Sequence, residues 1–196
     1  MLRHGWLYPS PPASGNAYLV SALRRLFPMP ETPDTRYGAD FFTIYGIVLM
    51  GRVASISHAL GAYRVHHTGA PTTSFANSED IAKAPRAFSA RWNILQTLAR
   101  TRLGIELPQS FHDFSHEKAL FCTEVYGAPV KTRWRWAALH SHSYLHSIVA
   151  NPFWSIKKKI GTIALSSLCL VPYSPLSDYA VRYISNPLAR RKSVAL

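Results

Sequence analysis

Among the side chains that could carry chemistry, Asp40 has the most unusual setting. Residues 1–77 contain three acids, and the other two, Glu31 and Asp34, lie in the proline-rich loop PMPETPDT. Asp40 instead precedes FFTIYGIVLM, an almost unbroken apolar run. A carboxylate that enters an apolar environment needs a partner, a helix end or a chemical role, because its desolvation is costly. Two interpretations are open: Asp40 caps a buried helix, or it acts as a general base at the edge of an apolar pocket.

Histidines provide the second set of candidate groups. His112 and His116 have the i, i+4 spacing that places both on one helix face, and Glu117 follows them. The zinc-protease pattern needs a glutamate directly after the first histidine, where this chain has Asp113. A second group contains one more pair with this spacing and consists of His140, His142 and His146. We predict that both groups are surface histidines rather than metal ligands.

The two cysteines offer little chemistry. Cys122 and Cys169 are far apart in the sequence and form no CxxC motif. This spacing favours two buried free thiols over a disulfide or a metal-binding pair.

Apolar spacing indicates the elements that would position these groups. It predicts a helix over residues 17–27, a buried helix over 40–50, and two short strands at 53–57 and 61–67. Helical patterns dominate the rest of the chain. The predicted fold class is therefore α+β, with a mixed α/β part over residues 1–77 and a helical extension over 78–196.

Positive charge is concentrated in the last third of the chain. The net charge is +12, and residues 131–196 contribute ten Lys/Arg against one acid. Two stretches there, KTRWRWAALH and FWSIKKKIGTIALSSLCLVP, combine cations, aromatic rings and apolar residues. The apolar run 160–172 is shorter than the ~20 residues that a membrane span needs. This composition predicts contact with an anionic surface, although a hairpin packed on its own domain with solvated lysines is an equal alternative.

Three stretches in the first part of the chain carry a family resemblance. They are PPASGNAYLVSALRRLFPMPE, YGADFF and GRVASISHALGAYRVH, and they span about residues 5–68. Their order and spacing resemble the C-terminal half of the catalytic domain of family-2 glycosyltransferases, which are inverting enzymes with a GT-A fold. The resemblance implies that residues 1–77 form the acceptor-side part of a GT-A-like α/β half-domain.

The same resemblance implies roles for individual residues. Asp40 falls where the family places the general base that deprotonates the acceptor hydroxyl. His66 falls near a group that contacts the metal or the donor diphosphate in some relatives. Arg64 could pair with that diphosphate, or with Asp40 or the C-terminal loop. The turn that lines the cleft for acceptor and donor would consist of Ser14, Gly15 and Asn16.

The chain also departs from the family pattern. Enzymes of this family begin with a nucleotide-binding half and hold a divalent metal, Mg or Mn, on an Asp-x-Asp motif, and no Asp-x-Asp occurs in this chain. We therefore expect this chain to be a fragment that is inactive alone, because the N-terminal half of the enzyme is either missing or a separate chain. The intact enzyme would use a nucleotide-sugar donor and a hydroxyl acceptor in polysaccharide or glycolipid synthesis, on the cytoplasmic side and peripheral to the inner face of the membrane. The alternative is a non-catalytic basic module that binds anionic membrane or, less readily, nucleic acid through residues 131–196.

Overall fold

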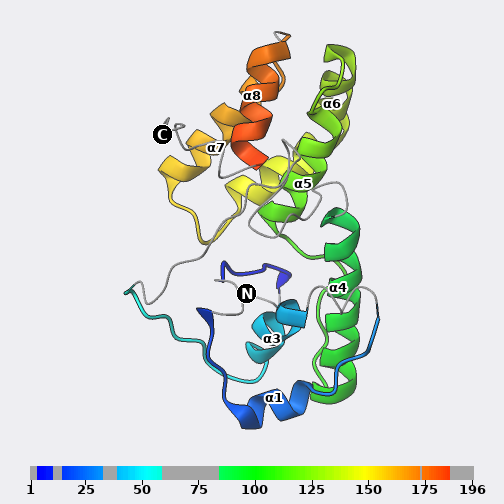
Figure 1. Cartoon of the computed structure of the whole chain (residues 1–196), viewed down its shortest axis with the longest axis vertical. Coiled ribbons are helices and arrows are strands. Elements are labelled where there is room, and N and C mark those ends of the chain that lie inside the picture. Colours follow the sequence, from blue (N-terminus) through cyan, green and yellow to red (C-terminus); the bar gives the residue numbers. More distant parts are fainter. Residues whose placement is uncertain (1–3, 11–14, 33–38, 59–83, 173, 186–196) are drawn as a thin grey trace, which may run out of the picture. The chain divides into compact units, whose positions relative to one another are not determined.

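The computed structural model describes residues 4–10, 15–32, 39–58, 84–172 and 174–185. The chain divides into two compact units, which are considered separately (Figure 1). Unit 1 comprises Met1–Tyr63 and Arg86–His112, and unit 2 comprises Arg64–Pro85 and Asp113–Leu196. The boundary predicted at residue 77 lies outside the described residues and stays a prediction.

The predicted α+β class, with a partial GT-A-like α/β half-domain, is wrong for the described part of the chain. The elements described there are all helical, and β-pairing is limited to one isolated parallel bridge between Trp6 and His112. Residues 53–57, predicted as a strand, form no ladder, and Ile56 is 71% exposed. A strand is stable only when a neighbour accepts its backbone hydrogen bonds. The second predicted strand, 61–67, lies outside the described residues.

Among the described residues of unit 1, the short helices α1 (Val20–Leu26) and α3 (Ala39–Ile47) pack on each other. Helix α1 ends where Phe27 adopts an extended backbone (φ −90°, ψ 155°), because the residue before a proline avoids the helical region. Leu26 is fully buried against Gly46 of α3, where an added Cβ would lie 2.9 Å from the Leu26 side chain. A glycine at this position therefore allows the two helices to approach.

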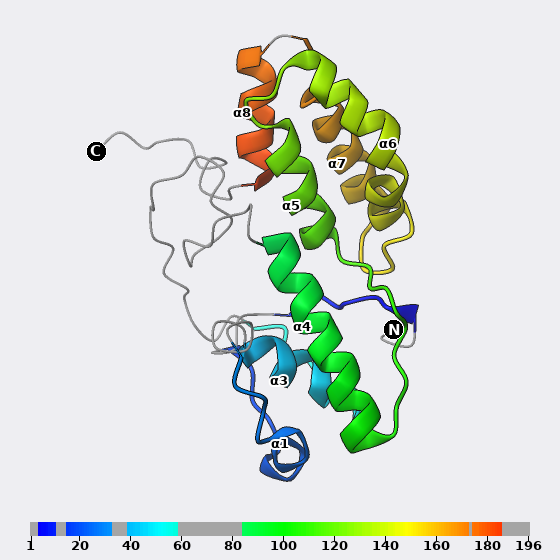
Figure 2. The same cartoon turned by 90° about the vertical axis from the view of Figure 1, so that its right-hand side faces the viewer.

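The core of unit 1 forms between α3 and α4 (Ala84–Leu98), which continues into the π-helical turn η3 (Ala99–Leu103) (Figure 2). The predicted helical extension, residues 78–196, includes α4. In the structure the apolar face of α4 instead packs against that of α3, in the core of unit 1. Gly104, with φ 65°, ends η3, and the chain then returns along the unit, where the carbonyl of Pro108 accepts a hydrogen bond from Trp92 Nε1 at 3.2 Å. The buried cluster consists of Leu7, Phe41, Phe42, Trp92, Leu95, Leu98, Ala99 and Leu107.

In its described residues, unit 2 contains four helices: α5 (Phe114–Val125), α6 (Val130–Val149), α7 (Ile156–Leu168) and α8 (Ser174–Ser185). Contacts between them run in cyclic order, from α5 to α6, α7 and α8 and back to α5, as Figure 2 shows. Each helix thus buries one face against two neighbours, which is how a four-helix bundle encloses a core.

The centre of unit 2 is aromatic and includes a buried polar pair between α6 and α7. The ring of Phe121 lies 5.0 Å from that of Trp136 and 4.8 Å from that of Tyr144. The hydroxyls of Tyr144 and Ser166, both buried, lie 2.8 Å apart and share a hydrogen bond across α6 and α7. This bond satisfies a polar group that would otherwise be costly in the core.

Cys122 and Cys169 are free and fully buried in unit 2, as predicted. Burial raises the pKa of the Cys122 thiol to about 12 and also raises the pKa of Cys169. Both groups are therefore neutral thiols at physiological pH, whereas the thiolate is the reactive form.

We expect neither native thiol to react with a disulfide reagent such as DTNB in the folded protein at mildly alkaline pH, and both to react in denaturant. The reason is that folding raises the pKa of each thiol and shields it from the reagent. The measurement is the absorbance of the released thiolate over time. A Ser167→Cys variant, which places a thiol at an exposed position of α7, is the matched control and should react quickly. Native thiols that react at the control rate would contradict this account.

Candidate functional site

The first candidate site is the beginning of α3, where Asp40 lies in the first helical turn. The helix starts one residue earlier, at Ala39, so Asp40 lies inside the turn rather than before it. Its side chain is exposed, while the next two residues, Phe41 and Phe42, are buried. A negative charge in this turn is favourable, because the unsatisfied N–H groups of a helix start carry positive partial charge. The carboxylate of Asp40 is thus exposed, and it is anchored beside an apolar core.

The polypeptide next to α3 is fixed by two tyrosines that sequence reasoning did not single out. Tyr8 donates a hydrogen bond to the carbonyl of Ile44 at 2.8 Å, and Tyr45 donates to the carbonyl of Tyr8 at 3.3 Å. Their rings meet edge to face at 5.3 Å. Burial, with a smaller contribution from nearby Tyr18, raises the pKa of Tyr8, so its hydroxyl stays protonated and keeps donating. These contacts hold the N-terminal segment on α3.

Tyr18 is the second group in this region that was missed. Its hydroxyl oxygen is buried and has no hydrogen-bond partner among the described residues. Buried polar atoms are nearly always paired, so an orphan hydroxyl stands out. The available signal was its place in the stretch SGNAY, directly after the predicted binding turn.

The other predicted site residues are only partly described. Gly15 is exposed and Asn16 is half-buried. Ser14, Arg64 and His66 lie outside the described residues, so their predicted roles in substrate or metal binding stay predictions.

The histidines have structural contacts or face solvent. The ring of His112 packs on Trp6 at 5.0 Å, and His116 Nδ1 lies 3.2 Å from a carboxylate oxygen of Glu117. Asp113 is the N-cap of α5, because its side chain accepts a hydrogen bond from the backbone N–H of His116 at 3.1 Å. The second group, His140, His142 and His146, is exposed as predicted. Within the described ranges no group of three or more His, Cys, Asp or Glu side chains could hold a metal ion.

The second candidate site is the basic and aromatic stretch KTRWRWAALH, which lies in α6. Some of its side chains face the core of unit 2 and others face solvent. Arg133 and Trp136 face the core, at 1% and 9% exposure. Trp134 and Arg135 are exposed. The prediction that the whole stretch meets an anionic partner is therefore too broad, because one of its arginines is internal.

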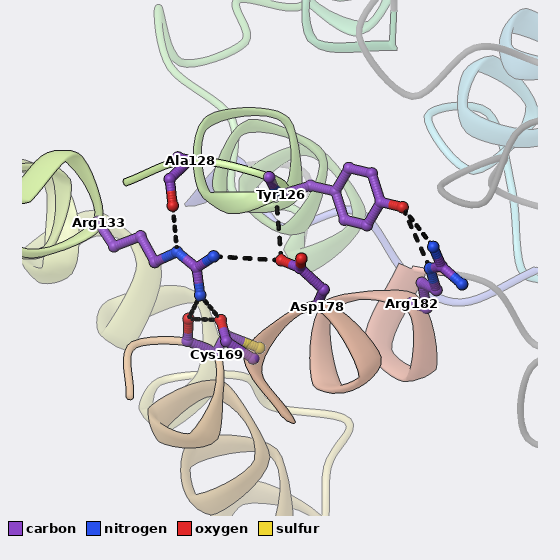
Figure 3. Close-up of polar contacts among 8 residues, drawn as sticks. Tyr126, Ala128, Arg133, Cys169, Asp178 and Arg182 are labelled. Carbon is purple, nitrogen blue, oxygen red and sulfur yellow. Dashed lines mark hydrogen bonds and ion pairs between the residues drawn. The ribbon is translucent and has the colours of Figure 1, made fainter. Parts of the chain in front are cut away.

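Arg133 joins three parts of unit 2 (Figure 3). Its Nε donates to the carbonyl of Ala128 at 2.7 Å, and its Nη2 lies 3.2 Å from a carboxylate oxygen of Asp178 on α8. Its Nη1 donates to the hydroxyl of Ser177 and to the carbonyl of Cys169, which follows α7. A guanidinium can satisfy several acceptors in one plane, which a lysine cannot. Arg133 is thus a structural cation.

A second arginine, Arg182, also makes its contacts within the protein. Arg182 of α8 donates to the hydroxyl of Tyr126 from Nη2 at 2.8 Å and from Nε at 3.1 Å (Figure 3). The same carboxylate of Asp178 that faces Arg133 accepts from the backbone N–H of Gly127 at 3.3 Å. These contacts connect α8 to the turn between α5 and α6.

Helix α7 buries a serine and exposes two isoleucines. Ser166 is its buried residue, whereas Ile156 and Ile160 are 74% and 63% exposed. At its start, Lys158 lies over the ring of Trp154 at 4.1 Å, and Lys159 donates to the carbonyl of Val149 at the end of α6 at 2.7 Å. Lysines and exposed aliphatic side chains therefore occur together here.

No helix in the described part of the chain has both the length and the apolar character needed to cross a membrane. The sequence matches no protein-family model, no curated protein and no solved structure.

We expect Arg133→Ala to lower the free energy of unfolding by about 3–5 kcal/mol, because it removes a buried cation and leaves its acceptors without a donor. Urea denaturation followed by circular dichroism measures this. The matched control is Arg135→Ala, two residues away on the same helix and exposed, which should change stability by at most about 0.5 kcal/mol. Equal effects of the two substitutions would show that the contacts of Arg133 do not stabilise unit 2.

Proposed function

We propose that the chain contributes the acceptor-binding part of an inverting glycosyltransferase, an enzyme that transfers a sugar from a nucleotide-sugar donor to an acceptor hydroxyl. The observation that supports this most is the setting of Asp40. Its carboxylate is exposed to a substrate in the first turn of α3, and the buried rings of Phe41 and Phe42 anchor that turn. A general base needs both accessibility and a fixed position.

In this proposal Asp40 accepts the proton of the acceptor hydroxyl. The hydroxyl oxygen forms a bond to the anomeric carbon while the bond from that carbon to the diphosphate breaks, and the nucleoside diphosphate leaves with the bonding electrons. Attack from the face opposite the leaving group inverts the configuration. The described residues contain no cluster fit to hold a metal ion, so no step is assigned to one. A divalent ion, Mg²⁺ or Mn²⁺, bound with the help of His66 stays a prediction, as do binding roles for Ser14, Gly15, Asn16 and Arg64.

We expect the purified 196-residue chain to bind saccharide acceptors without transferring sugar, because it has no Asp-x-Asp to hold the donor. Binding is measured by changes in NMR signals against a panel of oligosaccharides and lipid-linked sugars, and transfer by a radiolabelled nucleotide-sugar assay. Asp40→Ala should weaken acceptor binding about tenfold, since it removes a charged hydrogen-bond acceptor. Asp40→Asn, which keeps an acceptor oxygen, should bind nearly as well as the parent chain.

The matched control is Glu106→Ala, which removes another exposed acid of unit 1 that is not part of α3. An acceptor panel whose binding is weakened equally by Glu106→Ala and Asp40→Ala would rule out a specific role for Asp40. Sugar transfer by the chain alone would contradict the predicted inactivity while leaving the role of Asp40 open to direct kinetic test.

A second candidate function is favoured by a separate observation in unit 2. The exposed cations Lys131, Arg135 and Lys157 lie on α6 and α7, and neither helix contains an acidic residue. We propose that the exposed parts of α6 and α7 contact an anionic membrane, which agrees with the predicted peripheral position on the cytoplasmic face. Nucleic acid is the less favoured partner, because Arg133 and Arg182 of the basic region are occupied within the protein.

We expect the chain to bind vesicles of anionic lipid and to bind single-stranded oligonucleotide only weakly at physiological salt. Co-sedimentation with vesicles and fluorescence anisotropy with a labelled oligonucleotide are compared over one salt series. Binding to vesicles should retain an apolar, salt-insensitive component, whereas oligonucleotide binding should fall steeply with salt because it depends on counterion release. Tight oligonucleotide binding with no vesicle binding would reverse the choice of partner.

A further inference from the structure

The outward face of α7 is the most unusual surface in the described part of the chain. With about 100° between successive helical residues, its exposed positions other than Lys158 fall in one sector about 140° wide. Besides Ser167, that sector contains Ile156, Lys157, Ile160, Gly161, Ala164 and Leu168, which are all exposed. The buried Ser166 lies on the opposite side, bonded to Tyr144. We call these exposed positions the outer face of α7.

For Ser166, Ile156 and Ile160, this arrangement is the reverse of what water alone would select. Apolar side chains gain free energy on leaving water, so a helix on a soluble bundle normally turns its isoleucines inward and its serines outward. Here Ile156 and Ile160 are more exposed than Ser166 and Cys169. The inner positions of α7 instead complete polar contacts with α6, through the Tyr144 hydroxyl and through the carbonyl of Cys169 that Arg133 binds. An outer apolar environment would therefore stabilise α7 in this orientation.

The charges around this face identify the kind of apolar environment. Lys157 lies within the sector and Lys158 next to it, while α6 and α7 contain no acidic residue. Lys158 is held over Trp154, which packs against Phe114 of α5 at 4.7 Å, so this end of the helix is anchored. Aliphatic side chains flanked by lysines match the boundary of an anionic lipid bilayer, where acyl chains lie beneath negatively charged headgroups. A nucleic acid would require stacking rings or base-reading polar groups, which this sector does not present.

We propose that the outer face of α7 is a membrane-binding surface that inserts Ile156 and Ile160 into an anionic leaflet, with Lys157 and Lys158 at the phosphates. The 13 residues of α7 extend about 20 Å at ~1.5 Å per residue, which is too short to cross a bilayer. The helix therefore lies parallel to the membrane surface, with one face in the lipid. This inference rests on the second proposed function and specifies the surface that performs it. It is independent of Asp40 and of sugar transfer.

The test uses the full chain and vesicles of phosphatidylcholine with about one third phosphatidylglycerol, with pure phosphatidylcholine vesicles alongside. The double variant Ile156→Ser/Ile160→Ser should lower the partition coefficient at least tenfold. Lys157→Gln/Lys158→Gln should lower it about tenfold on anionic vesicles and leave the weak binding to neutral vesicles unchanged. The matched control is Leu19→Ser in unit 1, a site as exposed as Ile156 (76% and 74%), which should change nothing.

A second readout reports insertion directly and does not depend on affinity. Because the native cysteines are buried, a polarity-sensitive dye can be attached to an Ile160→Cys variant and, as control, to Leu19→Cys. Its emission should shift to the blue on anionic vesicles at position 160 and stay constant at position 19. Circular dichroism melting confirms that each variant is folded.

Three results would overturn the inference. Vesicle binding that is unaffected by the α7 variants would leave the second function in place but move its surface elsewhere. Absence of any vesicle binding would rule out both the second proposed function and the membrane-binding role of α7. Concentration-dependent dimerisation in sedimentation velocity that is lost with Ile156→Ser/Ile160→Ser, without a dye shift on vesicles, would assign the face to a second copy of the chain.

Discussion

The buried guanidinium of Arg133 is the interaction on which unit 2 depends. It joins the turn before α6, the end of α7 and the N-terminal half of α8 through Ala128, Cys169 and Asp178. A buried cation is unfavourable unless its donors are satisfied, so the surrounding segments must adopt positions that supply acceptors. The same requirement sets the orientation of α7, because the carbonyl that follows this helix has to face Arg133. Once that end is set, the outward direction of Ile156 and Ile160 follows from helical periodicity.

Unit 1 is organised by apolar burial rather than by a buried charge. The rings of Phe41, Phe42 and Trp92 account for much of its core, and they bring α3 and α4 together across a long stretch of sequence. Asp40 takes its fixed position from this core, since the residue that follows it in the chain is already buried. The acid is therefore exposed but not free to move with a loop. The two units thus offer different chemistry: an anchored carboxylate in one, and lysines beside exposed aliphatic side chains in the other.

Local features of the fold followed from local sequence. Helix α1 ends before Pro28 because of the steric effect of the proline on Phe27, and α3 begins at the Ala-Asp step that precedes the apolar run. The burial of Cys122 and Cys169 also agreed with their apolar settings. The strand predicted at 53–57 was wrong, because alternation of residues describes a strand only when a neighbouring strand is present. The contact of α4 with α3 could not be predicted, since it joins segments separated by about 40 residues of chain and by a stretch that gave no helical period.

The sequence alone established the charge gradient, the helical character of the second half and the unusual setting of Asp40. It could not decide which face of α6 is buried. In TRWRWA, arginine and tryptophan alternate, so Arg133 with Trp136 and Arg135 with Trp134 form equivalent pairs on opposite sides of a helix. Tertiary structure breaks this equivalence, because only Arg133 meets the acceptors from α7 and α8. Those acceptors come from residues more than 35 positions away, and local periodicity carries no information about them.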